Sequence, residues 1–132
     1  MSGNKAIFDT NVIIFASKGL IDIEKLLDRY DRFYISIISY MEIYGYVFQD
    51  ENERRKIDNI IDNFEIIEVD FSIAQQVIQY KQTVKKKIKL PDAIILATAN
   101  YLQAELITDD WDDFINIDAN VKIITLEEFK YN

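Results

Sequence analysis

The sequence predicts a three-layer α/β/α domain built around a central, mainly parallel sheet. Short apolar segments with strand character alternate with amphipathic segments of helical spacing along the whole chain. This alternation is typical of strands joined by right-handed helical crossovers, which bury a parallel sheet between two helical layers. Only one proline and three glycines interrupt the sequence, and it contains no linker or repeat. We therefore expect residues 1–132 to form a single domain.

The first half of the chain contains three predicted strands and three helical segments. Residues 5–9 (KAIFD) form an apolar strand that ends in an aspartate, and residues 11–27 have helical spacing that breaks near Gly19. A second strand is expected at 33–37, followed by a helix that Ser39 begins and that continues through Val47. Residues 54–64 are amphipathic, with Ile57, Ile60, Ile61 and Phe64 at helical spacing, and 65–69 (EIIEV) form the third strand.

The second half repeats this pattern. A long helix is expected over 72–84, ending in the lysines 85–87, and Pro91 and Asp92 begin a helix over 93–103 that is rich in Ala, Ile and Leu. Two further short strands are expected at 106–108 and 121–125. The sequence has no apolar run long enough to span a membrane and no signal-peptide layout at its start. We therefore expect a cytoplasmic protein that does not associate with membranes.

The composition excludes several classes of active site. The chain has no cysteine and no histidine, which excludes disulfides, thiol catalysis, Ser-His-Asp triads and histidine-based zinc sites. It has 23 acidic and 15 basic residues, for a net charge of −8. Such a protein repels nucleic acid at long range. If it cuts nucleic acid, cations must neutralise its site and a local basic patch must contact the backbone.

Acidic residues follow strands or begin helices at four separate places. Asp9 ends the first strand, Asp109 and Asp110 follow the strand at 106–108, and Glu42 and Asp92 are each expected in the first turn of a helix. Sites in sheets of this kind lie beyond the carboxyl ends of the strands. We therefore expect these carboxylates to share one edge of the sheet.

Metal-assisted phosphodiester hydrolysis is the chemistry that such a cluster suits. Mg²⁺ and Mn²⁺ prefer oxygen ligands, and neighbouring carboxylates repel one another unless a cation lies between them. Each acid also has a structural interpretation. Asp9 could form an Asx turn with Thr10 and Asn11, Ser39 and Glu42 could form a capping box, and Asp92 could complement a helix dipole. The acids at 109, 110, 112 and 113 could belong to a solvated loop.

Four segments of the chain together resemble one known family. FDTN at 8–11, SYME at 39–42, LPDAIILATA at 90–99 and LITDDWDDF at 106–114 resemble PIN-domain proteins, and within them the VapC-like toxins of toxin–antitoxin pairs. The resemblance covers essentially the whole chain, and the motifs occur in the family's order. It implies a PIN-like parallel α/β fold and an endoribonuclease that depends on Mg²⁺ or Mn²⁺.

The resemblance also implies roles for individual residues. Asp9, Glu42 and Asp92 match the three principal acidic ligands, Asp110 matches the fourth, and Asp113 matches a further acidic position. Thr10 or Asn11, together with Thr108, match polar positions that orient carboxylates or a metal-bound water. Acids flank Asp110 on both sides, which leaves the assignment of the fourth ligand open among 109, 110, 112 and 113. Basic residues often found after that threonine are missing here.

Two further features bear on partners. The lysines at 85, 86, 87 and 89 form the one dense basic stretch, which is either a solvated helix end or a patch for RNA phosphates. Tyr40, Tyr44, Tyr46 and Phe48 either pack in the core or form a groove for a partner. The family resemblance implies an RNA substrate, a cognate antitoxin protein and a homodimer.

Two other functions remain open at this point. An aspartyl-phosphate phosphatase of the haloacid-dehalogenase type also has an aspartate at the end of its first strand, but it needs a second acid two residues later, where this chain has Asn11. A catalytically silent PIN-fold binding module is the other alternative. The full set of acids argues against it, because a scaffold gains nothing from their repulsion.

Overall fold

The structure is a computed structural model that describes residues 4–131, so residues 1–3 and 132 of the predicted domain lie outside the described residues. Its sheet has five strands in the order β3-β2-β1-β4-β5, and every neighbouring pair is parallel. The strands are β1 (Lys5–Phe8), β2 (Arg32–Ser36), β3 (Glu65–Ile67), β4 (Glu105–Ile107) and β5 (Ile123–Ile124). The predicted parallel sheet is confirmed.

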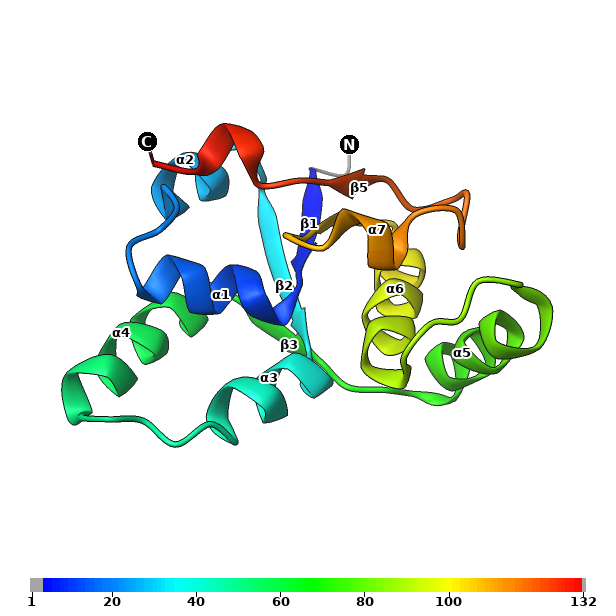
Figure 1. Cartoon of the computed structure of the whole chain (residues 1–132), viewed down its shortest axis with the longest axis horizontal. Coiled ribbons are helices and arrows are strands. Elements are labelled where there is room, and N and C mark those ends of the chain that lie inside the picture. The colour runs from blue at the N-terminus through cyan, green and yellow to red at the C-terminus, as the bar shows by residue number, and fades with distance from the viewer. Residues whose placement is uncertain (1–3, 132) are drawn as a thin grey trace.

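Helices cover both faces of this sheet, as predicted (Figure 1). On one side lie α1 (Thr10–Ser17), α2 (Ile23–Asp28) and α4 (Glu51–Ile61), and on the other α5 (Phe71–Thr83) and α6 (Leu90–Leu102). The helix α3 (Ile37–Tyr44) follows β2 directly, while α7 (Trp111–Phe114) and the 3-10 turn η1 (Glu127–Phe129) are single turns. Between residues 4 and 131, none of the helices has the length and apolarity needed to cross a membrane.

The strand sequence explains why there are two cores. Successive side chains of a strand point to opposite faces of the sheet. In β1, Ile7 packs with the core under α5 and α6, whereas Ala6 and Phe8 pack with the core under α1, α2 and α4. All three side chains are fully buried. The apolar residues of the strand therefore serve both layers.

Three helices, α3, α4 and α6, begin two or three residues earlier than expected, and α4 covers Glu51–Ile61 rather than 54–64. The helix α3 begins at Ile37 with Ser36 as its N-cap, whose hydroxyl accepts from the Ile38 N–H at 3.1 Å, so the predicted start at Ser39 is wrong. Ser36 is a competent cap that lies directly at the end of β2, and the chain turns there without a loop. The helix α6 begins at Leu90, with Pro91 in its first turn, where a missing N–H costs nothing.

Two other boundaries also differ from expectation. The helix α5 ends at Thr83, so the lysines 85–87 lie in the connection to α6 rather than on a helix end. The single-turn helix α7 was not expected, because its sequence WDDF is too short to show a helical period. It begins directly after Asp110 and brings the following acids back towards the sheet.

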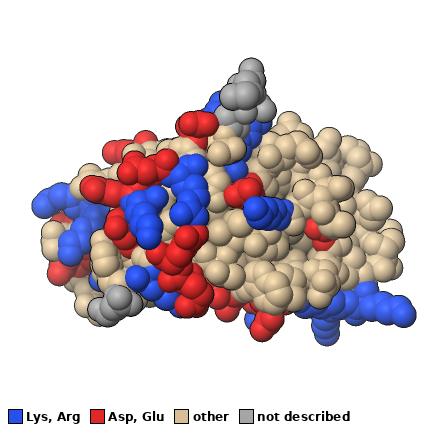
Figure 2. All heavy atoms as spheres, turned by 90° about the horizontal axis from the view of Figure 1, so that it is seen from above, with Lys and Arg blue, Asp and Glu red and all other residues tan. Residues whose placement is uncertain are grey.

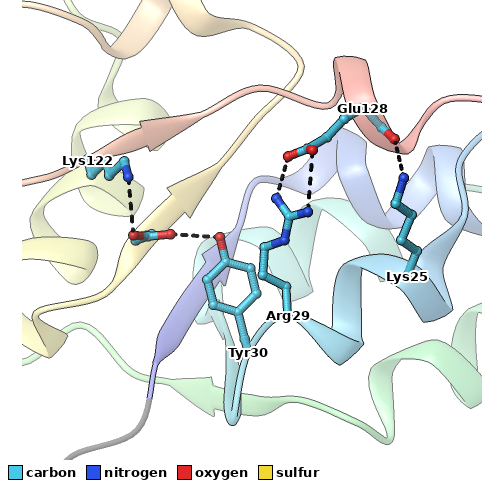
Figure 3. Close-up of polar contacts among 6 residues, drawn as sticks. Lys25, Arg29, Tyr30, Lys122 and Glu128 are labelled. Atoms are coloured by element: carbon cyan, nitrogen blue, oxygen red, sulfur yellow. Dashed lines mark hydrogen bonds and ion pairs between the residues drawn. The ribbon is translucent and has the colours of Figure 1, made fainter.

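The C-terminal segment is held against α2 at the edge where the strands begin (Figure 3). The Arg29 guanidinium forms an ion pair with the Glu128 carboxylate and lies over the Phe129 ring, with 4.8 Å between the guanidinium carbon and the ring centroid. Nearby, Tyr30 donates from its hydroxyl to Glu105 Oε1 at 2.8 Å. These contacts lie at the opposite edge of the sheet from the predicted acidic site.

The aromatic residues after β2 divide between core and surface. Tyr40 and Tyr44 pack against the core under α1 and α4, with ring centroids 4.8 Å apart, and the Tyr44 hydroxyl donates to Asp58 at 2.6 Å. Phe48 packs against the same core, but Tyr46 remains 53% exposed. The interpretation as core residues therefore holds for three of the four.

Candidate active site

The strand ends and helix starts bring the predicted acids to one edge of the sheet. Asp9 follows β1 and begins α1, and Asp110 lies just beyond β4 and begins α7. Asp92 lies in the first turn of α6, and Glu42 lies on α3. In Figure 1, α1, α3 and α6 begin on the side where β1 and β2 end. The parallel topology explains this grouping, because all five strands end at the same edge.

Asp9 is the most buried member of the group. Asp9 is only 6% exposed, and both of its carboxylate oxygens accept hydrogen bonds. The Thr10 N–H donates to Oδ1 and the Thr108 hydroxyl donates to Oδ2, each at 2.8 Å. Thr108 Oγ1 also accepts from the Asp110 N–H at 2.9 Å. One buried threonine thus links the acids that follow β1 and β4.

Glu42 is placed by a contact that the sequence analysis did not anticipate. Because α3 begins at Ile37, Glu42 lies in its second turn, and the predicted capping box with Ser39 does not form. Glu42 Oε1 instead accepts from the Thr10 hydroxyl at 2.7 Å. The buried Ser39 hydroxyl lies 3.0 Å from the same Thr10 oxygen. Thr10 therefore connects the start of α1 to the acid on α3.

The loop after β4 separates its four acids into different environments. Asp110 and Asp113 face the cluster, since the charge of Asp110 acts on Asp9 and the charge of Asp113 acts on Asp92. Asp109 instead forms an ion pair with Lys130 at 3.4 Å, and Asp112 is exposed. Asp110 and Asp113 thus act on the buried acids through their charges, whereas Asp109, whose charge acts on Asp110, is paired with a lysine.

Burial and mutual repulsion raise the pKa values of the cluster. Burial is the main cause that raises the pKa of Asp9 to about 6; the Thr108 and Thr10 hydrogen bonds oppose it, and Asp110 and Glu42 add to it. The pKa of Asp92 also rises to about 6, mainly by burial and then by the charges of Asp9 and Asp113. Burial and the charge of Asp113 likewise raise the pKa of Asp110. Such shifts in a group of neighbouring acids are typical of functional sites.

These residues fit a hard divalent cation by their chemistry. The donor set is made of carboxylate and hydroxyl oxygens, which Mg²⁺ and Mn²⁺ prefer, and the repulsion among the acids is what a cation would relieve. Within residues 4–131, no group of three acidic side chains lies close enough together to hold a metal ion in the conformations that the structure shows. Glu42 and Asp110 are exposed, so their side chains are free to turn towards an ion.

Not every predicted supporting residue contacts the cluster. Thr10 and Thr108 do, whereas the exposed Asn11 lines a neighbouring cavity of about 270 Å³ together with Glu42 and Tyr46. In the part of the chain that the structure describes, Asn11 has no hydrogen bond to the acids. Its predicted role in orienting a carboxylate therefore has no contact to support it.

The four lysines of the basic stretch have different environments. The Lys86 ammonium donates to the backbone oxygens of Asp112 and Ile115, so it binds the end of α7 rather than facing solvent. Lys89 is the N-cap of α6, and its charge lowers the pKa values of Asp92 and Asp110. Lys85 and Lys87 are exposed. Lys89 thus acts on Asp92 and Asp110 through its charge, and Lys86 acts as a structural contact.

Comparison with known proteins places this arrangement in a family. Residues 6–120 match the family described as the PIN domain. The chain belongs to the PIN-domain family. This confirms the family expected from the four motifs. A search of curated proteins gave no match.

Solved structures agree with this assignment. This PIN domain is similar to a chain of a toxin–antitoxin complex from Klebsiella pneumoniae, with 35% identity and a TM-score of 0.73 over 88% of this chain and 94% of that one. It shares its fold with chains of VapBC2 from Rickettsia felis bound to a promoter DNA fragment (TM-score 0.79, 21% identity, 92% and 98% covered) and of DNA-bound VapBC from Salmonella typhimurium (TM-score 0.77, 23% identity, 93% and 98% covered). The Klebsiella match agrees with the predicted resemblance to toxin–antitoxin proteins, and the other two matches show the shared fold.

Ser39 and Lys89 are the residues of this site whose positions the sequence analysis missed. Ser39 was interpreted as a cap, although a second serine three residues earlier, at the end of the strand, offers the same chemistry. Lys89 was grouped with the other lysines, yet its place directly before Leu90-Pro91-Asp92 sets it at the start of the helix that carries Asp92. In both cases the residue that decides the position lies directly beside a motif that the sequence shows clearly.

Replacing Thr108 by valine tests whether this hydroxyl positions the acids. The substitution keeps the shape but removes the donor to Asp9 and the acceptor for the Asp110 N–H. We expect the catalytic rate to fall about 10- to 100-fold, as for other residues that orient metal ligands, and the protein to lose about 1–3 kcal/mol of stability. Steady-state kinetics and a thermal melt measure both. An unchanged rate would show that Thr108 serves packing alone.

Proposed function

We propose that this PIN domain is a metal-dependent endoribonuclease and acts as the toxin of a toxin–antitoxin pair. The observation that carries the proposal is the pairing of the buried Asp9 with Asp92, two carboxyls whose pKa values are both raised to about 6 at the edge where the strands end. Acids held together against their repulsion, in a chain without histidine or cysteine, leave cation-assisted hydrolysis as the chemistry that uses them.

Each residue has a defined part in this proposal. Asp9, Glu42, Asp92 and Asp110 would hold Mg²⁺ or Mn²⁺, with Asp113 next to them, and a bound ion would activate water and stabilise the charge on the phosphate. Thr108 fixes one oxygen of Asp9 through its hydrogen bond, and Thr10 holds Glu42. Lys89 supplies a positive charge beside the acids, which would otherwise repel the RNA backbone.

A relative supports the antitoxin as a partner, and the family resemblance implies a second copy of the chain. The Klebsiella relative is part of a toxin–antitoxin complex, and we propose an antitoxin protein and a second copy of the chain as partners here, in the cytoplasm. Tyr46, which is 53% exposed, lines the cavity beside Glu42 and gives a partner segment an apolar contact near the acids.

Cleavage of single-stranded RNA with and without metal tests the function. Purified protein, freed of antitoxin, is mixed with RNA and Mg²⁺, Mn²⁺ or EDTA. We expect cleavage with either metal, none with EDTA, and recovery when excess Mg²⁺ is added back. Cleavage that persists in EDTA would contradict the metal-dependent mechanism, and no cleavage in any condition would favour the silent binding module.

The exposed lysines before α6 are expected to contribute to RNA affinity. Replacing Lys85 and Lys87 by alanine should weaken RNA binding and lower the slope of log affinity against log salt by about 1.4, since each phosphate contact on a single strand contributes about 0.7. Replacing Lys25 and Lys122, at the opposite edge of the sheet, provides the charge-matched control. Equal slopes for the two double variants would exclude the lysine patch from the RNA interface.

A further inference from the structure

A cavity of about 540 Å³ lies between α7 and the segment that leads into β5. Its lining includes Trp111, Phe114, Asn116 and Asp118. The volume falls within the range of roughly 300–1,000 Å³ that is usual for sites of small organic groups. Trp111 is the one tryptophan of the chain, and 45% of its surface remains exposed. Neither the metal chemistry nor the core accounts for this exposed indole.

The cavity adjoins the acidic cluster through α7. Trp111 follows Asp110 directly, and it shares one face of the turn with Phe114 and Ile115, three and four residues later, which also line the cavity. Asp110 and Asp113 are three residues apart on another face and act on Asp9 and Asp92 through their charges. A group in the cavity would therefore be next to whatever the acids hold.

The walls of the cavity are anchored to the rest of the domain. Asp118 accepts hydrogen bonds from the Tyr80 hydroxyl on α5, from Asn100 Nδ2 on α6 at 2.6 Å and from the Asn120 N–H at 2.9 Å. Lys86 binds the backbone oxygens of Asp112 and Ile115 from the other side. Phe114 is buried in the core. Trp111 thus projects from a fixed support, which a stacking surface requires.

The chemistry of the lining favours a flat, neutral group. Asp118 is the one charged residue among those that line the cavity. Seen from above, the molecule carries its charged side chains mainly over one half of the surface and few over the other (Figure 2). Asn116 lines the cavity in a left-handed conformation (φ 63°), and its exposed amide has two donors and an acceptor to offer. An indole beside an amide can bind a nucleobase, the first by stacking and the second by hydrogen bonds to its edge.

We propose that this cavity binds one unpaired base of the RNA, stacked on Trp111, next to the phosphodiester that the acids would cleave. The proposal rests on the proposed ribonuclease function and adds a base subsite to it. Stacking on an aromatic side chain tolerates any base, so Trp111 contributes affinity for single strands, and Asn116 contributes base preference. Double-stranded RNA, whose bases are stacked on each other, is excluded from this contact.

The test uses the tryptophan itself as the probe. The Asp92→Asn protein, which should cleave about a thousand-fold more slowly than wild type, is titrated in Mg²⁺ with a dye-labelled single-stranded RNA 12-mer. Anisotropy of the dye reports binding, and tryptophan fluorescence reports contact with Trp111. We expect quenching that saturates together with the anisotropy, and little quenching by the same sequence in a duplex. Adding Trp111→Ala should weaken binding about 5- to 150-fold, and Trp111→Phe should restore most of it.

Tyr101→Ala serves as the matched control, because Tyr101 is an aromatic of similar exposure (54%) outside the cavity lining. Binding by anisotropy with unchanged fluorescence, or equal loss for the Trp111 and Tyr101 variants, would overturn the base subsite and leave the ribonuclease proposal standing. If no RNA binds by either signal, the ribonuclease proposal fails and the subsite fails with it.

Discussion

Replacing Asp92 by asparagine is expected to lower the rate of RNA cleavage about a thousand-fold, because a carboxylate that holds a catalytic cation contributes several kcal/mol to the transition state. Asparagine keeps the size of the side chain and its place in the first turn of α6, but it removes the charge that faces Asp9 and Asp113. The effect should appear in kcat, measured by single-turnover cleavage in saturating Mg²⁺. Asp9→Asn should behave in the same way.

Asp112→Asn is the control for this experiment. Asp112 lies in the same acidic segment but is exposed, and the pKa shifts of Asp9, Asp92 and Asp110 have other charges among their main causes. We expect its rate to stay within about threefold of wild type. If Asp112→Asn and Asp92→Asn lost activity equally, net charge rather than a specific ligand set would explain the loss.

Asp9→Asn is expected to stabilise the metal-free protein at neutral pH. The folded protein raises the pKa of Asp9 from 3.8 to about 6, so the folded state binds this proton more tightly than the unfolded chain does. Protonation of Asp9 therefore favours folding below about pH 4, and this contribution is lost as the pH rises through 6. Above pH 6 the buried charge costs about 3 kcal/mol, which asparagine removes.

Thermal melts of the two proteins in EDTA between pH 4 and pH 8 measure this difference. The variant should melt at a higher temperature than wild type at pH 8 and at nearly the same temperature at pH 4. Excess Mg²⁺ should narrow the gap at pH 8, since an ion that binds only the folded wild type stabilises it. A variant that is less stable than wild type at every pH would show that the Thr10 and Thr108 hydrogen bonds outweigh the buried charge.

The fold could be predicted because its signals are local and repeated. The apolar strand before Asp9 and the Ala-rich helix after Pro91 each carry their own pattern, and their alternation determines a parallel sheet. The start of α3 could not be placed, because Ser36 and Ser39 are both able to cap a helix. The pairing of Ser36 with Ile67 of β3, a long-range contact, sets the end of the strand at Ser36 rather than at the expected residue 37.

The sequence predicts which acids lie at the same edge of the sheet. The linkages of the site could not be predicted, because Thr10 with Glu42 and Thr108 with Asp9 are contacts between residues 32 and 99 positions apart. The roles of the acids at 109, 110, 112 and 113 also depend on long-range contacts. Asp109 forms an ion pair with Lys130, and a sequence pattern does not show that a residue near the far end of the chain is its partner.

Binding of Mn²⁺ to the antitoxin-free protein, measured by calorimetric titration at pH 7, tests most directly whether the acids at this edge form a cation site. We predict saturable binding by wild type and by Asp112→Asn, and loss of that binding in Asp9→Asn and in Asp92→Asn. Binding that survives both substitutions would place the ion elsewhere. Wild-type protein that is folded and binds no Mn²⁺ would contradict the metal-dependent nuclease and favour a binding module that keeps the PIN fold without its chemistry.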